Sequence, residues 1–149
     1  MPHNAAQVYN GLIRSVVVFF SSFYESGEEV LELKKIKWPN KSFKTNGRPN
    51  FFEFQHFPAG YKILSLGENG INEHTGFFQL HIAVEDNTGD KFIRDWHSKL
   101  DDFYTTEKIF EYEDFQIIFE KSHLTDGRNI DGFFVETWVV EYRTKLIRK

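Results

Sequence analysis

The chain has 149 residues and a formal net charge of −4, and 40% of its residues are hydrophobic. This length favours a single domain over residues 1–149, and the share of apolar residues is sufficient for a hydrophobic core. The sequence has no cysteine, which excludes disulfides, thiolate metal ligands and cysteine nucleophiles.

The N-terminal region predicts a helix followed by a strand. Apolar residues recur every three or four positions over residues 4–24, as on one face of a helix, and Asn4 is suited to cap its start. Gly27 is placed to end this helix. A looser alternation of apolar and charged residues then predicts a strand over residues 30–38, which Pro39 ends.

The middle of the chain predicts extended segments. Residues 50–57 alternate between two faces and stop at Pro58, and residues 59–67 form a second short strand or extended arm. From residue 78 onward the alternation is regular, as in a half-buried antiparallel strand. The face that we expect to be buried carries Phe78, Leu80, Ile82 and Val84.

A second helix follows this strand. Apolar residues at helical spacing indicate an amphipathic helix that begins at Thr88 or Asp90 and ends near Tyr104. We expect Trp96, on the apolar side of this helix, to pack against the buried face of the preceding strand.

Two further strands complete the predicted elements. Residues 110–122 and residues 133–144 have the composition of strands, and a turn-rich connection joins them. The links between strands are mostly short, which favours antiparallel pairing. The sequence therefore predicts the α+β class, with a mainly antiparallel sheet and two helices packed on one side.

Three glycines, Gly67, Gly70 and Gly76, precede the regular strand. A Walker loop requires Gly-x-x-x-x-Gly-Lys-Ser/Thr before a helix, whereas Glu68 and Ile71 directly follow the first two glycines. A dinucleotide fingerprint requires Gly-x-Gly-x-x-Gly before a helix, and here the spacing differs and a strand follows. We therefore expect these glycines to supply positive φ angles in a loop between two strands.

No other motif indicates a catalytic, cofactor or metal site. The six histidines lack the His-x-x-x-His spacing of a helical zinc site. Asp101 and Asp102 are adjacent on a predicted helix and diverge by about 100°. Glu111 and Glu113 share a strand face that we expect to be solvated. We predict no catalytic residue, no cofactor and no metal ion.

Charge and hydropathy also bear on partners. Six basic residues lie between Lys34 and Arg48, and we expect them on an exposed sheet edge or loop. The longest apolar run, residues 16–20, is far shorter than the roughly 20 residues of a membrane-spanning helix. The N-terminus also lacks the basic start and apolar segment of a signal peptide. We expect no membrane partner and no sequence-independent DNA binding.

The order of several short motifs is similar to that of one protein family. Trp38-Pro39-Asn40 is followed by an aromatic strand that ends in proline, and then by Leu-Gly-x-x-Gly over residues 66–70. Gly76, an apolar strand and a terminal strand over residues 138–142 come next. This arrangement, over most of residues 36–144, resembles the bacteriophage tail-terminator proteins, including a related phage group of unknown function. The segment Glu25 to Lys35 departs from the family pattern.

The resemblance implies a structural role without catalysis. Tail terminators form a ring, usually a hexamer, on the last ring of the tail tube, where they stop tube polymerisation. The implied partners are other copies of the chain, the major tail tube protein and a head-completion or connector protein, and DNA passes through the ring without specific binding. The implied location is the head–tail junction of the virion, after assembly in the host cytoplasm. The candidate assembly loop comprises Leu66, Gly67, Gly70, Ile71 and Gly76.

Two alternatives stay open on the sequence. The chain could be another head–tail connector or tail-tube-like ring subunit, which would need the same kind of contact surfaces. It could also be a small ligand-binding or enzymatic α+β domain whose many phenylalanines line a cavity. The sequence shows no converging acid–base or metal set, which counts against the second alternative.

Overall fold

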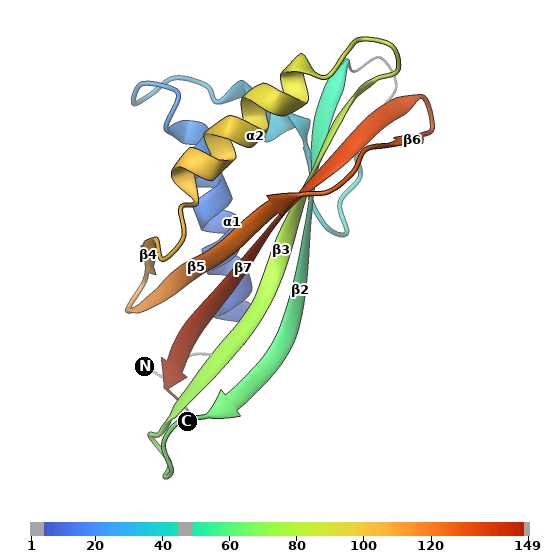
Figure 1. The fold of residues 1–149 in the computed structure, drawn as a ribbon. Coiled ribbons are helices and arrows are strands. Elements are labelled where there is room, and N and C mark those ends of the chain that lie inside the picture. Colours follow the sequence, from blue (N-terminus) through green and yellow to red (C-terminus); the bar gives the residue numbers. More distant parts are fainter. Residues whose placement is uncertain (1–4, 45–48, 148–149) are drawn as a thin grey trace.

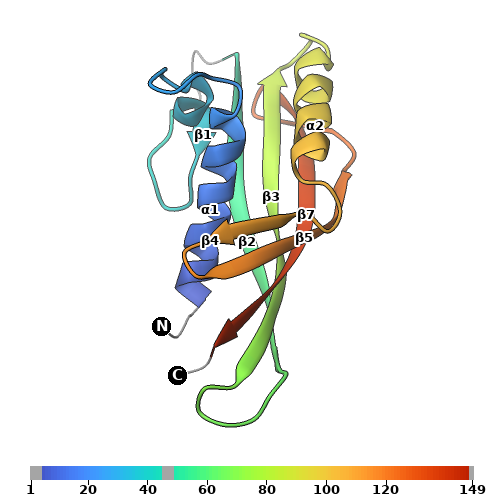
Figure 2. The same ribbon diagram turned by 90° about the vertical axis from the view of Figure 1, so that its left-hand side faces the viewer.

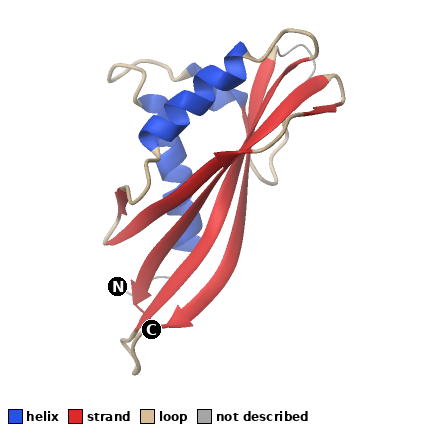
Figure 3. Cartoon of the chain, viewed as in Figure 1, coloured by secondary structure: helices blue, strands red, loops and turns tan. Residues whose placement is uncertain are grey.

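The computed structural model describes residues 5–44 and 49–147, in which two helical elements are followed by three strands, one helix and four strands (Figures 1 and 3). The helical elements are α1 (Ala5–Ser21), the short 3-10 helix η1 (Leu31–Lys35) and α2 (Lys91–Phe103). The strands are β1 (Ile36–Lys37), β2 (Asn50–Ile63), β3 (Ile71–Glu85), β4 (Ile109–Tyr112), β5 (Phe115–Leu124), β6 (Arg128–Ile130) and β7 (Phe133–Ile147).

The seven described strands form one curled sheet in the order β1-β2-β3-β7-β5-β4, with β6 also paired to β7. Strand β1 runs parallel to β2, and every other pair is antiparallel. The α+β protein thus has a mixed sheet, and the prediction of a mainly antiparallel one is wrong. The reason is the connection over residues 38–49, because a crossover of about a dozen residues is long enough to return the chain for parallel pairing.

Helices α1 and α2 lie side by side on the same side of the sheet (Figures 1 and 2). Between them and the strands lies a core in which about half of the residues are aromatic. The predicted inner face of β3 is confirmed, since each of its four side chains is at most 3% exposed. These side chains are Phe78, Leu80, Ile82 and Val84.

Trp96 packs differently from the prediction. Its ring lies 5.2 Å from Phe20 of α1 and 5.5 Å from Phe52 of β2, measured between centroids. Phe78 instead contacts Tyr104, at 5.6 Å, and Trp138, at 5.8 Å. Helix α2 contacts β3 directly, Trp96 also packs onto α1 and β2, and Tyr104, which follows the helix, covers the centre of β3.

Two buried polar contacts fix the orientation of the helices. The Ser15 hydroxyl donates to the Leu12 carbonyl over 2.7 Å, so the Tyr104 hydroxyl, 2.9 Å away, donates to Ser15. Burial raises the pKa of Tyr104, which keeps this hydroxyl protonated. Asp101 of α2 accepts a hydrogen bond of 3.1 Å from the indole of Trp138 on β7. This carboxylate therefore joins α2 to β7.

The predicted strand over residues 30–38 is mostly a 3-10 helix, and only Ile36–Lys37 form a strand. Val30, Leu33 and Ile36 face the core at intervals of three, which is the period of a 3-10 helix. The charged residues between them point outward, so the same pattern had resembled a loose strand alternation. Helix α1 also ends at Ser21, before the predicted end, and Asn4 lies outside the described residues.

Two other strand boundaries differ from the prediction. The segment 110–122 is a hairpin of β4 and β5, because Glu113 adopts a positive φ of 52° and turns the chain. The segments before and after Pro58 form one continuous strand, β2, with a register shift between Pro58 and Gly60. Pro58 is accommodated because that part of β2 has no described strand on its outer side.

Truncating Trp96 tests the contact between the two helices. Trp96→Ala should lower the free energy of unfolding by about 3–5 kcal/mol, because it removes an indole that is only 7% exposed. Urea denaturation of purified protein measures this change. Leu31→Ala is the control, since Leu31 is 54% exposed and should tolerate truncation. Equal stability of the two variants would contradict this packing.

Candidate functional site

The clearest candidate for a functional site is the arm, residues 58–76, which comprises the ends of β2 and β3 and their connecting loop. The arm extends beyond the helices at one end of the sheet (Figures 1 and 2). Its loop is held by defined hydrogen bonds: the Ile71 amide donates to the Ser65 hydroxyl over 2.8 Å, and the Gly70 amide donates to the Gly67 carbonyl over 3.2 Å. The loop is therefore a structured turn.

Large apolar side chains are exposed along this arm. Leu66 at the tip is 90% exposed, Tyr61 is 63% exposed and Ile63 is 57% exposed. The other exposed apolar side chains here are Leu64, Ile71 and, on the adjoining end of β7, Ile147. Apolar side chains gathered on one projection are typical of a surface that contacts another macromolecule.

The arm exposes these side chains because the helix layer ends at its base. Ala5 and Val8 of α1 lie beside His56 and Pro58, and no described helix extends further along β2. Tyr61 lines the same hollow as Ala5 and Val8, but it stacks on His74, the opposite residue on β3, with ring centroids 5.4 Å apart, and is still 63% exposed. The side chains toward the tip therefore have no core to enter.

Gly76 lies at the base of the arm and not in the loop. It belongs to β3, where an added Cβ would stand 2.7 Å from both the Phe57 carbonyl oxygen and the Tyr142 hydroxyl. That hydroxyl is 2.6 Å from Nε2 of His56. Burial raises the pKa of Tyr142 to about 12 and lowers the pKa of His56. Gly76 is thus needed for close packing and not for a positive φ.

The five predicted site residues therefore divide into two groups. Leu66, Gly67 and Gly70 lie in the loop and Ile71 begins β3, so these four residues meet at the tip. Of the three glycines, only Gly67 has the predicted positive φ, at 101°. The sequence did not predict Tyr61 and Ile63 as site residues, because their exposure depends on where the helix layer ends and no local pattern shows that.

The outer edge of β2 is open along most of its length. Strand β1 pairs only with Phe52 and Glu53, and no other described strand lies on that side. Pro58 has no amide hydrogen to donate, and the bulge at Ala59 interrupts the register. The edge is therefore a poor template for adding a strand, and contacts of the arm depend on its side chains.

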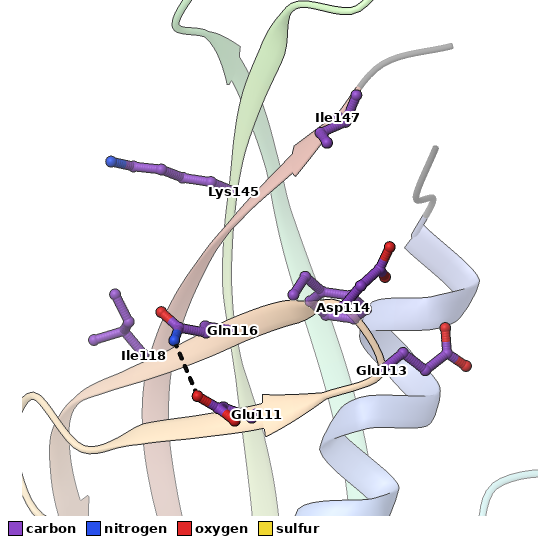
Figure 4. Close-up of a pocket in the computed structure, with 8 residues that line it drawn as sticks. Glu111, Glu113, Asp114, Gln116, Ile118, Lys145 and Ile147 are labelled. Atoms are coloured by element: carbon purple, nitrogen blue, oxygen red, sulfur yellow. Dashed lines mark hydrogen bonds between the residues drawn. The ribbon is translucent and has the colours of Figure 1, made fainter. Parts of the chain in front are cut away.

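A hollow of about 540 Å³ beside the β4–β5 turn is lined by three acidic side chains together with Lys145, Gln116 and apolar residues (Figure 4). Glu111 accepts a hydrogen bond of 3.3 Å from Gln116, and Glu113 accepts one of 3.0 Å from Gln7 of α1. The carboxylates of Glu111, Glu113 and Asp114 point in different directions in Figure 4. Glu113 leaves the strand face that the sequence predicted, because it forms the turn.

Two of the histidines that were considered as metal ligands have structural partners. The His97 ring lies 3.0 Å from Asp101, and His81 bridges Thr137 and Gln55. No group of three or more possible metal ligands exists among the residues that the structure describes. None of the helices in the described ranges has both the length and the apolar character needed to cross a membrane.

The basic segment lies at the edge of the sheet. Lys34 pairs with Glu29, Lys35 donates to Asn50 over 3.2 Å, and Lys37 on the edge strand β1 lies 3.7 Å from Glu53. Arg48 lies outside the described residues. Lys35 and Lys37 therefore connect this segment to β2, whereas Lys34 pairs within its own exposed segment.

Comparisons with known proteins show a similar fold and identify no family. No family model matches the chain, and no curated protein matches it. The fold is similar to that of a solved structure, with a TM-score of 0.69 and 9% sequence identity, over 98% of this chain and 96% of the other. The name of that protein states no activity, and at this identity the likeness concerns the fold alone.

Substitution of Gly76 tests the packing at the base of the arm. Gly76→Ala should destabilise the protein by about 1–3 kcal/mol, because the new methyl group overpacks the site. Thermal melting followed by circular dichroism measures the loss. In a Tyr142→Phe background the cost of the same change should be smaller, since one of the two close oxygens is gone. An alanine tolerated without loss in both backgrounds would contradict this packing.

The free energy of unfolding should also decrease as the pH falls, because burial lowers the pKa values of three histidines. Burial lowers the pKa values of His56, His74 and His81 below the ordinary value of 6.5. Below that value the unfolded chain binds protons that the folded chain does not, so the free energy of unfolding decreases as the pH falls from about 7.5 to 5.5. Urea denaturation across this range measures the slope.

His81 gives this pH dependence a specific test. Its neutral ring can donate from Nε2 to Gln55 over 3.0 Å and accept at Nδ1 from Thr137 over 2.6 Å, and protonation removes that acceptor. His81→Gln should therefore flatten the dependence, and the exposed His123→Gln is the control. Identical slopes for the parent and the His81 variant would contradict this assignment.

Proposed function

We propose that the chain is a structural subunit of the bacteriophage tail-terminator class. In this proposal, copies of the chain assemble into a ring, sixfold in its expected form, on the end of the tail tube. The ring stops growth of the tube and presents the surface to which the DNA-filled head attaches. The proposal starts from the resemblance of the segment around Gly67 and Gly70 to that family.

One observation carries the proposal: a structured arm that holds its apolar side chains away from the core. A loop that serves only as a turn needs no exposed leucine at its tip, but Leu66 of this loop is 90% exposed. The free energy gained by burying apolar surface, about 25 cal/mol per Å², becomes available only when a partner covers the arm. An arm of this kind suits a protein whose task is assembly.

The genome passes through the ring in this proposal without being held. Six copies of a chain with a net charge of −4 carry a strongly negative total charge. A basic channel would bind DNA phosphates by releasing counterions, and a neutral or acidic one would not. The lysines from Lys34 to Lys44 are therefore assigned to the outer wall or to a contact between subunits.

Charging the tip of the arm tests the proposal. Leu66→Asp should leave the melting temperature unchanged, because the side chain contacts no core. The same change should abolish self-association in sedimentation velocity and reduce the yield of finished phage particles. Leu31→Asp, at a site that is 54% exposed and remote from the arm, is the matched control. Normal assembly of the Leu66 variant would overturn the proposal.

The position of the protein in the particle separates a terminator from other ring subunits. Electron microscopy of tails should place its density at the head-proximal end, as a single ring. Density repeated along the tail would indicate a tube subunit, and the absence of density at that end would contradict both the location and the role.

A further inference from the structure

A groove of about 480 Å³ lies on the side of the sheet that the helices leave uncovered. Its walls are aromatic: Phe51 of β2 lies 5.6 Å from Phe43 and 4.9 Å from Phe133 of β7, measured between ring centroids. Ala83 of β3 and Val135 of β7 line it as well and are nearly buried. The groove thus has aromatic sides, and polar side chains such as Gln55, Gln79 and His81 share its lining.

The groove and the arm lie at opposite ends of the same strands. Ala83, in the groove, pairs with Phe51 near the start of β2, whereas Ile71 is at the arm end of β3. The two positions on β3 are roughly 40 Å apart at about 3.3 Å per residue. The arm cannot reach the groove of its own chain, but a second copy can offer one.

We propose that the arm of one copy docks into this groove of the next copy. The proposal rests on the self-assembly proposed above and names the surface that receives the arm. Leu66 enters between the walls formed by Phe43 and Phe133, where its apolar surface is removed from water. The arm and the groove are different surfaces, so the contact repeats head to tail and generates a closed ring or an open chain.

The charges of the groove lining balance, and one of them, Arg128, is opposite in sign to a charge on the arm. In the groove, Lys37 is paired with Glu53, and Arg128 makes no ion pair with any described residue. Asp131, in the β6–β7 turn, is the other charged residue of the lining. On the arm, Glu68 at the tip makes no ion pair with a described residue either. Docking brings Glu68 to Arg128.

Disulfide cross-linking tests the contact directly, because the chain has no cysteine of its own. Leu66→Cys combined with Ile130→Cys, a groove residue that is 39% exposed, should give a ladder of cross-linked copies on a non-reducing gel after mild oxidation. Leu66→Cys combined with Leu31→Cys is the control. Leu66→Cys alone should give no product beyond a dimer.

Charge reversal provides a second test. Glu68→Arg and Arg128→Glu should each weaken self-association by roughly tenfold or more, because each places like charges together. The double variant should restore the association. Sedimentation velocity measures the three variants against the parent, and circular dichroism verifies that these exposed substitutions leave the fold intact.

The outcomes separate this inference from the proposed function. If copies associate through Leu66 but the double variant Leu66→Cys, Ile130→Cys cross-links no better than the control, the groove is not the receiving surface and the ring proposal stands. If the cysteine introduced at Ile130 cross-links in tails to the tube protein and not to a second copy, the inference is also overturned. If neither the parent nor any variant associates, the proposed function itself fails.

Discussion

The length of the strands relative to the helices determines what this protein exposes. Helix α1 has 17 residues, which span about 26 Å at about 1.5 Å per residue, whereas β3 has 15 residues, which span about 50 Å at about 3.4 Å per residue. Two helices of this size cover only part of such a sheet. The arm is the uncovered end, and the groove uses the uncovered face.

The covered part of the sheet is stabilised by aromatic packing with a few polar anchors. Phe78, Tyr104 and Trp138 meet at the centre with ring centroids 5.1–5.8 Å apart, within the range of favourable aromatic pairs. Rings of this size leave few alternative packings, and the hydrogen bonds of Tyr104 to Ser15 and of Trp138 to Asp101 select one of them. The position of both helices, and hence the end of the helix layer, is fixed by these contacts.

The sequence predicted the elements whose periodicity is strong. Helix α2 and the inner face of β3 from residue 78 onward follow from regular spacing, because one side of each of these segments is buried. The segment 30–36 lacks so clear a period. Its mixture of apolar and charged residues suits both a 3-10 helix and a loosely alternating strand. Exposure of Tyr61 and Ile63 was not predictable, because it depends on the length of a helix distant in sequence. The same holds for Gly76, whose close neighbour Tyr142 lies on another strand.

The construction of the arm bears on how tightly it can bind. Association loses free energy when flexible loops become ordered, and this loss is small when the bound shape exists beforehand. The loop is already closed by the bond from Ile71 to Ser65, and its base is fixed by the contact between His56 and Tyr142 around Gly76. A partner that covers Leu66 therefore gains the burial of apolar surface with little ordering cost. In the proposed assembly, this gain favours a short arm with few contacts as the link between copies, and the groove some 40 Å away at about 3.3 Å per residue gives the repeat its direction.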